Sequence, residues 1–341
     1  MTNRVYWMTI RGEGENGHSI ERIWNLLTRE TSKHGQLQRR SRALLVMIEP
    51  VRVSVNVPLS VTRAGAIDGL FDLSGRVAII TGGAGLLGRQ HAAVIADAGG
   101  TVVFADLSGE SAQEAAAGLE ADVGATAMGI RADVTSKSDV AAMTAAVMQR
   151  FGRVDILINN AAMTVKGGSH SAGDYFAAFE EYPLDLWQKA LDVNLTGAFL
   201  CSQAIGRVMV DQRSGVMVNI ASDVGNISPD HRIYEGMVNP HTGTPFNTPI
   251  AYATTKAALI NFTRYLATYW AEKGIRVNCL SPGGVFNNHD SRFVEQVASR
   301  IPLARMAKAD EYRGAVLFLV SDASSYMTGA NLIVDGGRTA W

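Results

Sequence analysis

The sequence predicts an α/β fold in which one catalytic domain is built on a doubly wound parallel β-sheet with helices on both faces. Two observations carry this prediction. From residue 71 onward, short Val- and Ile-rich runs alternate with Ala-rich stretches of helical length, which is the pattern of repeated strand–helix–strand units. A glycine-rich turn, Thr81–Gly88, also follows the first of these strands, where such folds bind phosphate groups.

The predicted strands are short apolar runs bounded by turn residues, and the predicted helices are the longer stretches between them. Strands that alternate with helices of this length are joined by right-handed crossovers into a parallel sheet. The strands are expected at 76–81, 101–106, 126–133, 154–162, 215–222, 275–282 and 331–337. The helices are expected at 86–99, 109–123, 136–151, 184–211 and 250–273.

The composition allows a large core and gives no sign of a nucleic-acid partner. Of 341 residues, 47% are hydrophobic and 18% are charged, and the formal net charge is −1, whereas nucleic-acid-binding domains are strongly basic. Cys201 and Cys279 both lie in apolar runs, so we expect buried free thiols in a reducing cytoplasm. No uncharged apolar run reaches the ~18 residues of a membrane span, so no transmembrane helix is expected.

Residues 1–68 differ in character from the rest of the chain. They hold ten Lys and Arg against six Asp and Glu, hence a net charge of +4, which leaves −5 for residues 69–341. We see no site chemistry in them. We therefore expect an N-terminal extension over 1–68 that is poorly ordered or reflects a mis-annotated start, with a regulatory or membrane-surface arm as the alternative, and a catalytic domain over 69–341.

Two carboxylates follow predicted strands near the glycine-rich turn. Asp106 ends the second strand, where a carboxylate accepts hydrogen bonds from an adenosine ribose and repels a 2′-phosphate. The following stretch, "DLSGE", has no Lys or Arg to bind such a phosphate, so NAD is favoured over NADP. Asp133 ends the third strand and either meets the adenine or caps the next helix.

The stretch "AYATTK" (251–256) places Tyr252 and Lys256 one helical turn apart, on the same face of a predicted helix. A phenol titrates near pH ~10. An ammonium group held nearby favours the phenolate and lowers the pKa of the phenol. The spacing therefore suits a tyrosine that acts as an acid or base near neutral pH, although the same pair also occurs by chance on surface turns.

Taken together, these motifs resemble the short-chain dehydrogenase/reductase family over residues 71–341. The turn Thr81–Gly88 is followed in the family's order by "NNAA" (159–162), "DVNLTGAF" around Asn194, "NIAS" ending at Ser222, "YATTK" (252–256) and "SPGG" (281–284). Each motif is weak by itself, whereas the ordered set is specific. The resemblance implies a Rossmann-type fold and hydride transfer between a nicotinamide cofactor and an alcohol or ketone.

The resemblance also implies a role for each site residue. Tyr252 would move the proton, Lys256 would lower the tyrosine pKa and hold the nicotinamide ribose, Ser222 would orient the substrate oxygen, and Asn194 would kink or hydrate the long helix and support a water relay to Lys256. Asn159 and Ala161 would line the adenosine side. No metal is expected. The implied cofactor-binding residues are Thr81, Gly82, Gly85, Leu87, Gly88, Asp106, Asp133, Val134, Asn160, Ala161, Tyr252, Lys256, Pro282, Gly283 and Val285.

The chain departs from the family pattern in four places. Leu86 stands where glycine is usual, which puts the turn geometry in doubt, and Ala162 also replaces a glycine. Asn287 stands where many members have Thr. Ser222 and Tyr252 are thirty residues apart, because a polar, turn-rich insert separates them, and a long loop of this kind at an active-site rim is usually functional.

Polar residues with few aromatics around the expected rim suit a polyhydroxylated or anionic substrate better than a steroid or acyl chain. The insert, "SPGGVFN" and the C-terminal "VDGGRTAW" are most similar to a bacterial subgroup of the family linked to surface-glycan and flagellin-modification sugars. Gluconate, polyol and deoxy-sugar-acid dehydrogenases are the rival subgroups. The rim candidates are Asp230, His231, Arg232, Tyr234, Glu235, Lys166, Ser169, His170, Asn288, His289 and Arg292.

Two other functions compete with an NAD-dependent oxidoreductase acting on a sugar, sugar acid or sugar nucleotide. One is a catalytically silent NAD-binding regulator or redox sensor, and the presence of all four family catalytic residue types counts against it. The other is an interaction protein that works through its N-terminal arm, which is only weakly basic. Family resemblance and the apolar stripes on the helices at 184–211 and 250–273 predict a homotetramer or homodimer.

Overall fold

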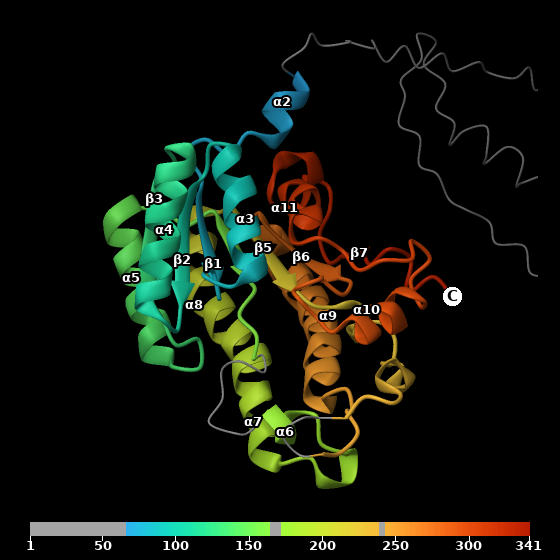
Figure 1. Ribbon diagram of the computed structural model, residues 1–341. Coiled ribbons are helices and arrows are strands. Elements are labelled where there is room, and N and C mark those ends of the chain that lie inside the picture. The colour runs from blue at the N-terminus through green and yellow to red at the C-terminus, as the bar shows by residue number, and fades with distance from the viewer. Residues whose placement is uncertain (1–65, 164–171, 239–242) are drawn as a thin grey trace, which may run out of the picture. The chain divides into compact units, whose positions relative to one another are not determined.

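The computed structural model describes residues 66–163, 172–238 and 243–341. Seven parallel strands form one sheet in the order β3-β2-β1-β4-β5-β6-β7 (Figure 1). The strand order reverses between β1 and β4, so the crevice of a doubly wound sheet opens at their carboxyl ends. The predicted fold class is confirmed. The strands are β1 Val77–Thr81, β2 Thr101–Asp106, β3 Ala127–Arg131, β4 Ile156–Asn159, β5 Gly215–Ile220, β6 Ile275–Pro282 and β7 Asn331–Val334.

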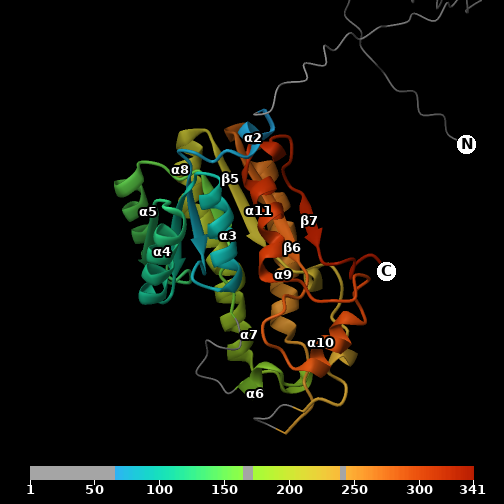
Figure 2. The same cartoon turned by 45° about the horizontal axis from the view of Figure 1, so that its top comes forward.

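Helices cover both faces of the sheet because alternate strand residues point to opposite sides. In β1, buried Ile80 packs with one helical layer and buried Ile79 with the other. The first layer contains α3 (Leu86–Asp97), α4 (Gly109–Val123) and α11 (Arg313–Val320), with α3 and α11 side by side in front of the sheet (Figure 2). The second contains α5 (Lys137–Phe151), α8 (Gly197–Gln212) and α9 (Ile250–Trp270).

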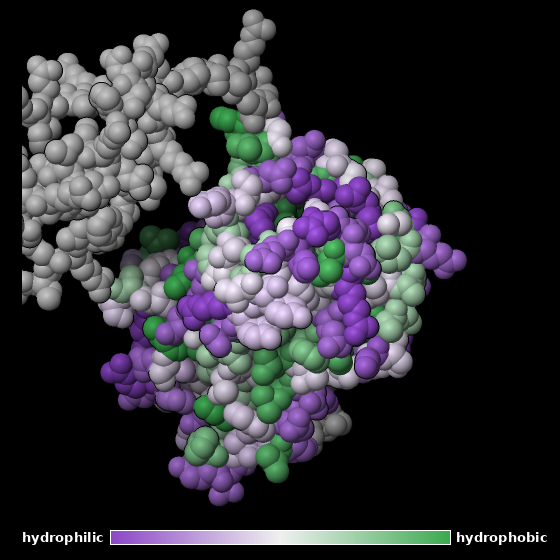
Figure 3. Space-filling model, turned by 180° about the vertical axis from the view of Figure 1, so that it is seen from behind, coloured by the Kyte–Doolittle hydropathy of each residue, from purple (hydrophilic) through white to green (hydrophobic). Residues whose placement is uncertain are grey.

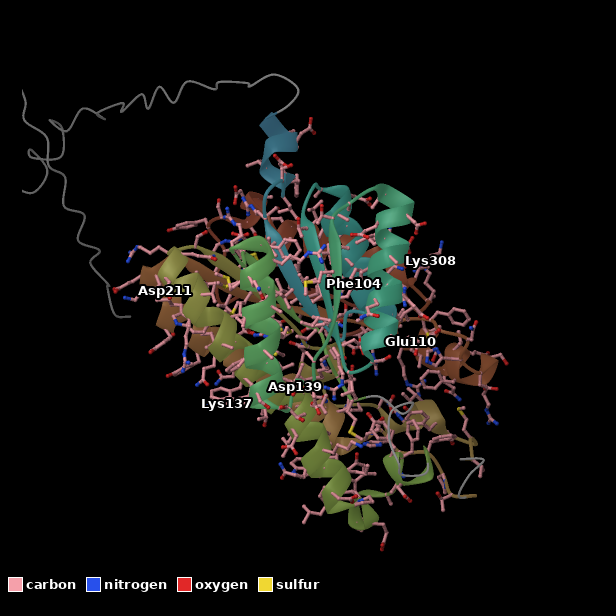
Figure 4. All side chains as sticks on the ribbon, turned by 90° about the vertical axis from the view of Figure 1, so that its left-hand side faces the viewer. Phe104, Glu110, Lys137, Asp139, Asp211 and Lys308 are labelled. Atoms are coloured by element: carbon pink, nitrogen blue, oxygen red, sulfur yellow. The ribbon has the colours of Figure 1, made fainter. Side chains whose placement is uncertain are left out.

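The predicted elements of the first half lie within a few residues of the observed ones, because their ends are specified locally. The side chains of Ser108 and Ser136 accept hydrogen bonds from backbone N–H groups in the first turns of α4 and α5. Each of these helices ends at a glycine in the left-handed conformation, Gly124 or Gly152. Figure 4 shows Glu110 and Asp139 at these helix starts, with Phe104 inside the sheet between the two layers.

The helix expected over 184–211 is interrupted. It consists of α7 (Leu184–Leu191), one π-helical turn η5 (Asp192–Thr196) and α8. The whole segment, Leu184–Gln212, is long and apolar enough to cross a membrane by length and composition, although it is not an uncharged run, since it contains Lys189, Asp192 and Arg207 among other charged residues. Cys201, Ile205 and Met209 of α8 are buried against the sheet, so the segment is a core helix of this fold.

The last third of the chain contains elements that the sequence analysis did not assign. Helix α10 (Ser291–Ala298) follows β6, and α11 covers the sheet next to α3. In its described residues, 223–238 and 243–249, the insert after β5 has no long helix, as predicted, and contains the short turns η6 (Asp223–Gly225) and η7 (His231–Tyr234). All described elements lie in one compact unit, Thr62–Trp341, which begins with α2 (Ala66–Phe71). The predictions for the extension fall almost wholly outside the described residues. The remaining short helices are α6 (Ala172–Tyr175), η4 (Phe179–Glu181), η8 (Ala271–Lys273), η9 (Ala309–Tyr312) and η10 (Asp322–Ser324).

Candidate active site

The glycine-rich turn joins β1 to α3 through backbone geometry that a side chain would prevent. Gly82 has a φ of +59°, and a Cβ there would lie 2.9 Å from the Ala161 Cα. A Cβ on Gly88 would lie 2.5 Å from the Gly82 carbonyl oxygen. Leu86, the departure from the family pattern, has an exposed side chain at the start of α3, so it leaves the turn undistorted. Leu87 beside it is partly buried.

The segment after β4 braces this turn. The Thr81 hydroxyl accepts hydrogen bonds from the Asn160 and Ala161 backbone N–H groups at 3.0 and 3.1 Å. The Asn160 amide donates to the carbonyls of Thr81 and Gly82, both at 3.0 Å. Asn159 is different from the expectation, because its amide lies in the interior and donates to Ser202 and Asn219. It therefore does not line the adenosine side.

Two carboxylates stand at the carboxyl ends of β2 and β3. The Asp106 Oδ2 atom accepts a hydrogen bond from the Ala84 N–H of the glycine turn at 3.1 Å, which holds a carboxylate beside the turn. Asp133 does not cap α5, because the N-cap of that helix is Ser136. Asp133 is partly buried, and its Oδ1 atom accepts hydrogen bonds from the Thr135 N–H and hydroxyl groups. Val134 is buried, so its side chain is part of the core.

Tyr252, Lys256 and Ser222 meet where α9 passes the end of β5. Ser222 is buried and hydrogen-bonds Tyr252. The Lys256 ammonium is buried, donates to the Ile220 carbonyl at 2.6 Å and lies 5.6 Å from the centre of the Tyr252 ring. Gly225 allows this approach, because a Cβ there would lie 2.8 Å from the Lys256 carbonyl carbon.

The electrostatics of the pair differ from the expectation that Lys256 lowers the pKa of Tyr252. Burial raises the pKa of Tyr252, the hydrogen bond from Ser222 opposes the rise, and the charge of Asp223 adds to it. Burial also lowers the pKa of Lys256 to about 8. Because the ammonium points at the Ile220 carbonyl, desolvation outweighs the attraction that the four-residue spacing suggests.

Asn194 lies in the π-helical turn η5, a type of distortion that is frequent at functional sites. It is buried, its amide donates to the Thr255 hydroxyl at 2.9 Å, and its Oδ1 accepts from the Met163 N–H at 2.7 Å. Asn194 therefore ties the long helix to α9, one residue before Lys256, and to the end of the β4 segment.

Comparison with known proteins agrees with this geometry. The sequence model of a family described as enoyl-(acyl carrier protein) reductase matches residues 83–339. The D-threitol dehydrogenase of Mycolicibacterium smegmatis is 33% identical over 279 residues, which are 80% of this chain and 96% of that protein. A short-chain type dehydrogenase/reductase from Mycobacterium marinum has a solved structure with a TM-score of 0.68 and 34% identity, covering 80% of this chain and 98% of that one. This chain belongs to the short-chain dehydrogenase/reductase family. It is an enzyme of the oxidoreductase class.

Two other solved structures of the family contain different cofactors. The gluconate 5-dehydrogenase of Burkholderia cenocepacia, in complex with NADP and tartrate, has a TM-score of 0.70 and 30% identity, covering 81% of this chain and 99% of that one. An NAD⁺-bound xylitol dehydrogenase has a TM-score of 0.67 and 30% identity, covering 78% and 99%. The family resemblance is confirmed, while the choice between NAD and NADP and the glycan-sugar subgroup stay predictions.

The "SPGG" segment of this short-chain dehydrogenase is braced by its C-terminal tail. A Cβ on Gly283 would lie 2.8 Å from the Asp335 Cα, and the Tyr312 hydroxyl donates to the Gly283 carbonyl at 3.0 Å. Pro282 is buried and Val285 pairs with Ala307 in an isolated bridge. Backbone packing thus fixes the segment that carries Pro282, Gly283 and Val285, which the family resemblance implies as cofactor-binding residues.

The rim is formed by the insert and α10, which are tied together by arginines. Arg300 Nε donates to Asp230 Oδ2 at 2.6 Å, and Arg292 Nη1 donates to the Gly236 carbonyl at 3.0 Å. Hydrogen bonds from Arg232 and Arg300 hold the pKa of Asp230 far below its usual range. Of the other rim candidates, His231, Glu235, Asn288 and His289 are exposed, while Lys166, Ser169 and His170 lie outside the described residues.

The rim is more aromatic than the sequence analysis expected. Tyr234 stacks on Phe246 and Phe293, with ring centres 5.8 and 5.6 Å apart, and Phe176 meets both Tyr234 and Phe246 edge-on. These rings come from α6 and the segment after it, the insert and α10, which lie far apart in the sequence. Their convergence is a property of the fold that no local pattern shows. Over residues 66–163, 172–238 and 243–341, no group of three His, Cys, Asp or Glu side chains is placed to hold a metal ion.

Proposed function

We propose that this enzyme interconverts a secondary alcohol and a ketone on a small polyhydroxylated substrate, with Tyr252 as the acid–base group. The observation that carries the proposal is the meeting of Tyr252, Ser222 and Lys256 at the carboxyl end of the sheet. A phenol that hydrogen-bonds a buried hydroxyl, one helical turn from a buried ammonium, has the parts required to move a proton. No described residue favours the alternative of a silent regulator.

The residues around the crevice fit a nicotinamide dinucleotide. The first turn of α3, which begins at Leu86, has backbone N–H groups without intrahelical partners, which suits a pyrophosphate. Asp106 stands beside the glycine turn as an acceptor for a ribose diol. We propose that the cofactor residues of the sequence analysis hold the dinucleotide, except for the side chain of Val134, which packs in the core. The cofactor, when bound, supplies hydride exchange at its nicotinamide ring.

Each proposed catalytic residue has a distinct task. Tyr252 holds the proton on its phenol oxygen and transfers it to or from the substrate oxygen, which Ser222 orients by hydrogen bonding. Lys256 holds the nicotinamide ribose and stabilises the phenolate when Tyr252 loses its proton. Asn194 holds the long helix against α9 through Thr255, so it positions the backbone that carries Lys256.

NAD is the proposed cofactor, because the Asp106 carboxylate would repel a 2′-phosphate. Asp106→Ala is expected to lower the ratio of kcat/KM for NAD to that for NADP by about tenfold, the effect of roughly 1.4 kcal/mol. Asp97→Ala, at the exposed end of α3, is the control. A ratio that does not change in Asp106→Ala would contradict the proposed contact.

A polyol, sugar or sugar acid is the proposed substrate class. D-Threitol, xylitol and gluconate dehydrogenases are among the relatives, and the rim carries Asp230, Arg232 and Arg292 at its edge. The Tyr234 ring stacks on those of Phe246 and Phe293, and we propose that this apolar cluster packs against the C–H side of such a molecule. A surface-glycan sugar falls within the same class.

The helices α8 and α9 are proposed to form the contact of a homotetramer or homodimer. Phe199 of α8 and Tyr265 and Tyr269 of α9 are exposed large hydrophobic residues, and the two tyrosine rings stack 5.9 Å apart. They border a hollow of about 600 Å³ between the helices. Seen from behind, the surface shows pale and green residues, of intermediate and high hydropathy, between purple hydrophilic areas (Figure 3). Light scattering that gives the mass of one chain would contradict this.

A cytoplasmic location and a catalytic domain over 69–341 are part of the same proposal. Cys201 and Cys279 are free and buried, and burial raises the pKa of the Cys279 thiol to about 11, which keeps it protonated and inert. Such thiols suit a reducing compartment. We propose that residues 1–68 are dispensable for turnover.

The test is the absorbance of reduced nicotinamide, followed with NAD and NADP against glycerol, tetritols, pentitols, sugars, sugar acids and nucleotide sugars, with a 3-oxoacyl thioester as an outside class. We expect turnover with a polyol or sugar and a loss of about 10³-fold in Tyr252→Phe. Tyr326→Phe, whose fully exposed side chain has no proposed role, is the matched control. Full turnover by Tyr252→Phe would overturn the mechanism, and turnover of the thioester alone would overturn the substrate class.

A further inference from the structure

A buried ion pair lies directly behind Ser222, and the proposed mechanism does not use it. Arg338 Nη1 donates to Asp223 Oδ2 at 2.8 Å, and the two side chains are 9% and 3% exposed. Asp223 is the first residue of the insert, whereas Arg338 follows β7. Burying two charges is unfavourable unless both are well bonded, so a pair at this depth beside a reactive group requires an explanation.

The C-terminal tail is folded so that Arg338 reaches this position. The Asp335 carboxylate accepts hydrogen bonds from the N–H groups of Gly337 and Thr339 at 2.8 and 2.7 Å. Gly336 and Gly337 both have positive φ values, +68° and +90°, which other residues adopt at a cost. The guanidinium is therefore held by the backbone of the tail as well as by its partner.

The other Asp223 oxygen fixes the direction of the Ser222 hydroxyl. Asp223 Oδ1 is 2.8 Å from Ser222 Oγ and also accepts from the Val224 N–H. A carboxylate paired with an arginine only accepts hydrogen bonds, so Ser222 must be the donor. Because serine has a single proton, Asp223 and Tyr252 compete for it: while Ser222 donates to Asp223, it cannot donate the hydrogen bond that lowers the pKa of Tyr252.

Several titratable and charged groups face this network. The Asp223 charge raises the pKa of Tyr252, after the larger effect of burial. From α9, Lys256 lies 5.6 Å from the Tyr252 ring and donates to Ile220, and from α6, Tyr175 interacts with Tyr252. Other partners surround the pair itself: Tyr312 interacts with Asp223 and Asp335, and Tyr234 interacts with Arg338.

We propose that Asp223 and Arg338 are positioning residues for the reaction: Asp223 directs the Ser222 proton away from Tyr252, and Arg338 compensates the Asp223 charge that Tyr252 experiences. The inference rests on the proposed role of Tyr252. The aligned chain Arg338–Asp223–Ser222–Tyr252 passes the state of charge at the tail to the acid–base group. The pair thereby sets the pH range in which the phenol loses its proton.

Opposite changes follow from removing either charge. In Arg338→Gln the Asp223 charge is uncompensated and disfavours the phenolate of Tyr252. The acid-side midpoint, which is the pH at which alcohol oxidation falls to half its maximum, therefore moves up. In Asp223→Asn the remaining arginine favours the phenolate, so that pH moves down. Asp223 is linked to Tyr252 through Ser222 and lies closer to it than Arg338 does, so its charge has the larger effect. The midpoint of the double variant is therefore expected to lie between those of Asp223→Asn and the unaltered enzyme.

The experiment is the pH profile of kcat/KM for alcohol oxidation by the full-length enzyme at saturating cofactor. We expect shifts of about one pH unit in opposite directions for the two single variants. Arg338→Lys, which keeps the charge, is expected to restore the original profile. A merely structural role would lower activity or melting temperature in both variants and leave the midpoint in place, so unshifted midpoints would overturn the proposal.

Two controls keep the outcome decisive. Removing one partner of a buried pair destabilises the fold, so circular dichroism and melting temperature are measured for each variant. If a single variant does not fold, the double variant has no unpaired charge, and its expected shift to lower pH tests the same inference. Tyr252→Phe separates the two hypotheses: full activity there would refute the proposed function, whereas an inactive Tyr252→Phe with unshifted charge variants would refute only the role of the pair.

Discussion

The cofactor half of the sheet and the rim around the crevice are built in different ways. In the glycine turn, local features fix most of the geometry: Gly82 has a positive φ, the Gly85 N–H donates to the Gly82 carbonyl, and the Arg89 side chain donates to the Ala84 carbonyl. At the rim, side chains from distant segments hold the structure, as in Arg300–Asp230 and Arg338–Asp223. One half of the site is thus specified by local sequence, and the other depends on pairs that only the complete fold brings together.

The largest effect is expected at Lys256, because burial of its ammonium group serves activity and lowers the stability of the fold. Lys256→Met is expected to lower kcat/KM by about 10³-fold, the scale of a lost acid–base arrangement. The folded pKa of about 8 lies below the ordinary value of 10.5. Between these two pH values the unfolded chain therefore binds more protons, and stability rises with pH. The variant lacks that dependence.

We therefore expect the melting temperature of Lys256→Met to equal or exceed that of the unaltered enzyme at pH 7. The gain offsets the loss of the hydrogen bond to Ile220, which contributes about 1 kcal/mol. The advantage should shrink as the pH rises from 8 to 10.5. Lys273→Met, in the exposed turn after α9, is the control. A difference in melting temperature that stays constant over this range would contradict the buried, depressed ammonium.

The glycine turn is expected to show the next largest effect. At Gly82, the positive φ and the approach to Ala161 make Gly82→Ala destabilising by about 2 kcal/mol. At Gly85, φ is −73° and a Cβ would meet only the Gly82 carbonyl, at 3.2 Å, so Gly85→Ala should remain stable. Both should weaken NADH binding by tenfold or more, because the cofactor must approach the turn (about 1.4 kcal/mol).

Chemical denaturation and fluorescence titration of NADH measure the two quantities separately. If Gly85→Ala binds NADH as the unaltered enzyme does, the pyrophosphate does not lie over this turn. If Gly82→Ala is fully stable, the backbone conformation does not need glycine. Either result would weaken the view that backbone geometry specifies this half of the site.

The strands and the first helices could be predicted from sequence because their signals are local. β2 and β6 begin and end where expected, since β-branched runs and flanking turns mark them, and α4 ends at a glycine that takes the left-handed conformation. The positions of Tyr252, Lys256, Ser222 and Asn194 followed from family motifs. The raised pKa of Tyr252 did not, because it depends on burial and on Asp223.

The rest could not be predicted because it depends on contacts between distant residues. Arg338 follows a turn-like "DGG" sequence and lies 115 residues from its partner Asp223, so no spacing rule connects them. The aromatic cluster at the rim likewise joins Phe176, Tyr234 and Phe293 from three segments. The π-helical turn at Asn194 is also unmarked by the local apolar pattern, and only the family resemblance, which implied a kink there, indicated it.

The rim should respond more weakly than the turn, because its ion pairs are partly exposed. Arg300→Gln removes the link between Asp230 and the segment after α10, so KM should rise several-fold with little change in kcat, at a cost in stability below about 1 kcal/mol. Arg232→Gln is the matched control, since Arg232 is 78% exposed and leaves the Arg300 contact in place. Equal effects of the two variants would show that the link itself does not shape the substrate site.

The smallest effect is expected from removing residues 1–65. The described unit contains its own core and every proposed site residue, and α2 at its start packs near η10. A unit of this kind folds independently. We therefore expect kcat/KM to stay within about twofold of the full chain, because a contact worth less than roughly 0.4 kcal/mol changes a rate by no more than that. A folded, soluble truncated enzyme without turnover would show that the extension supplies part of the site, and the contrast between a local cofactor half and a long-range rim would then need a third region.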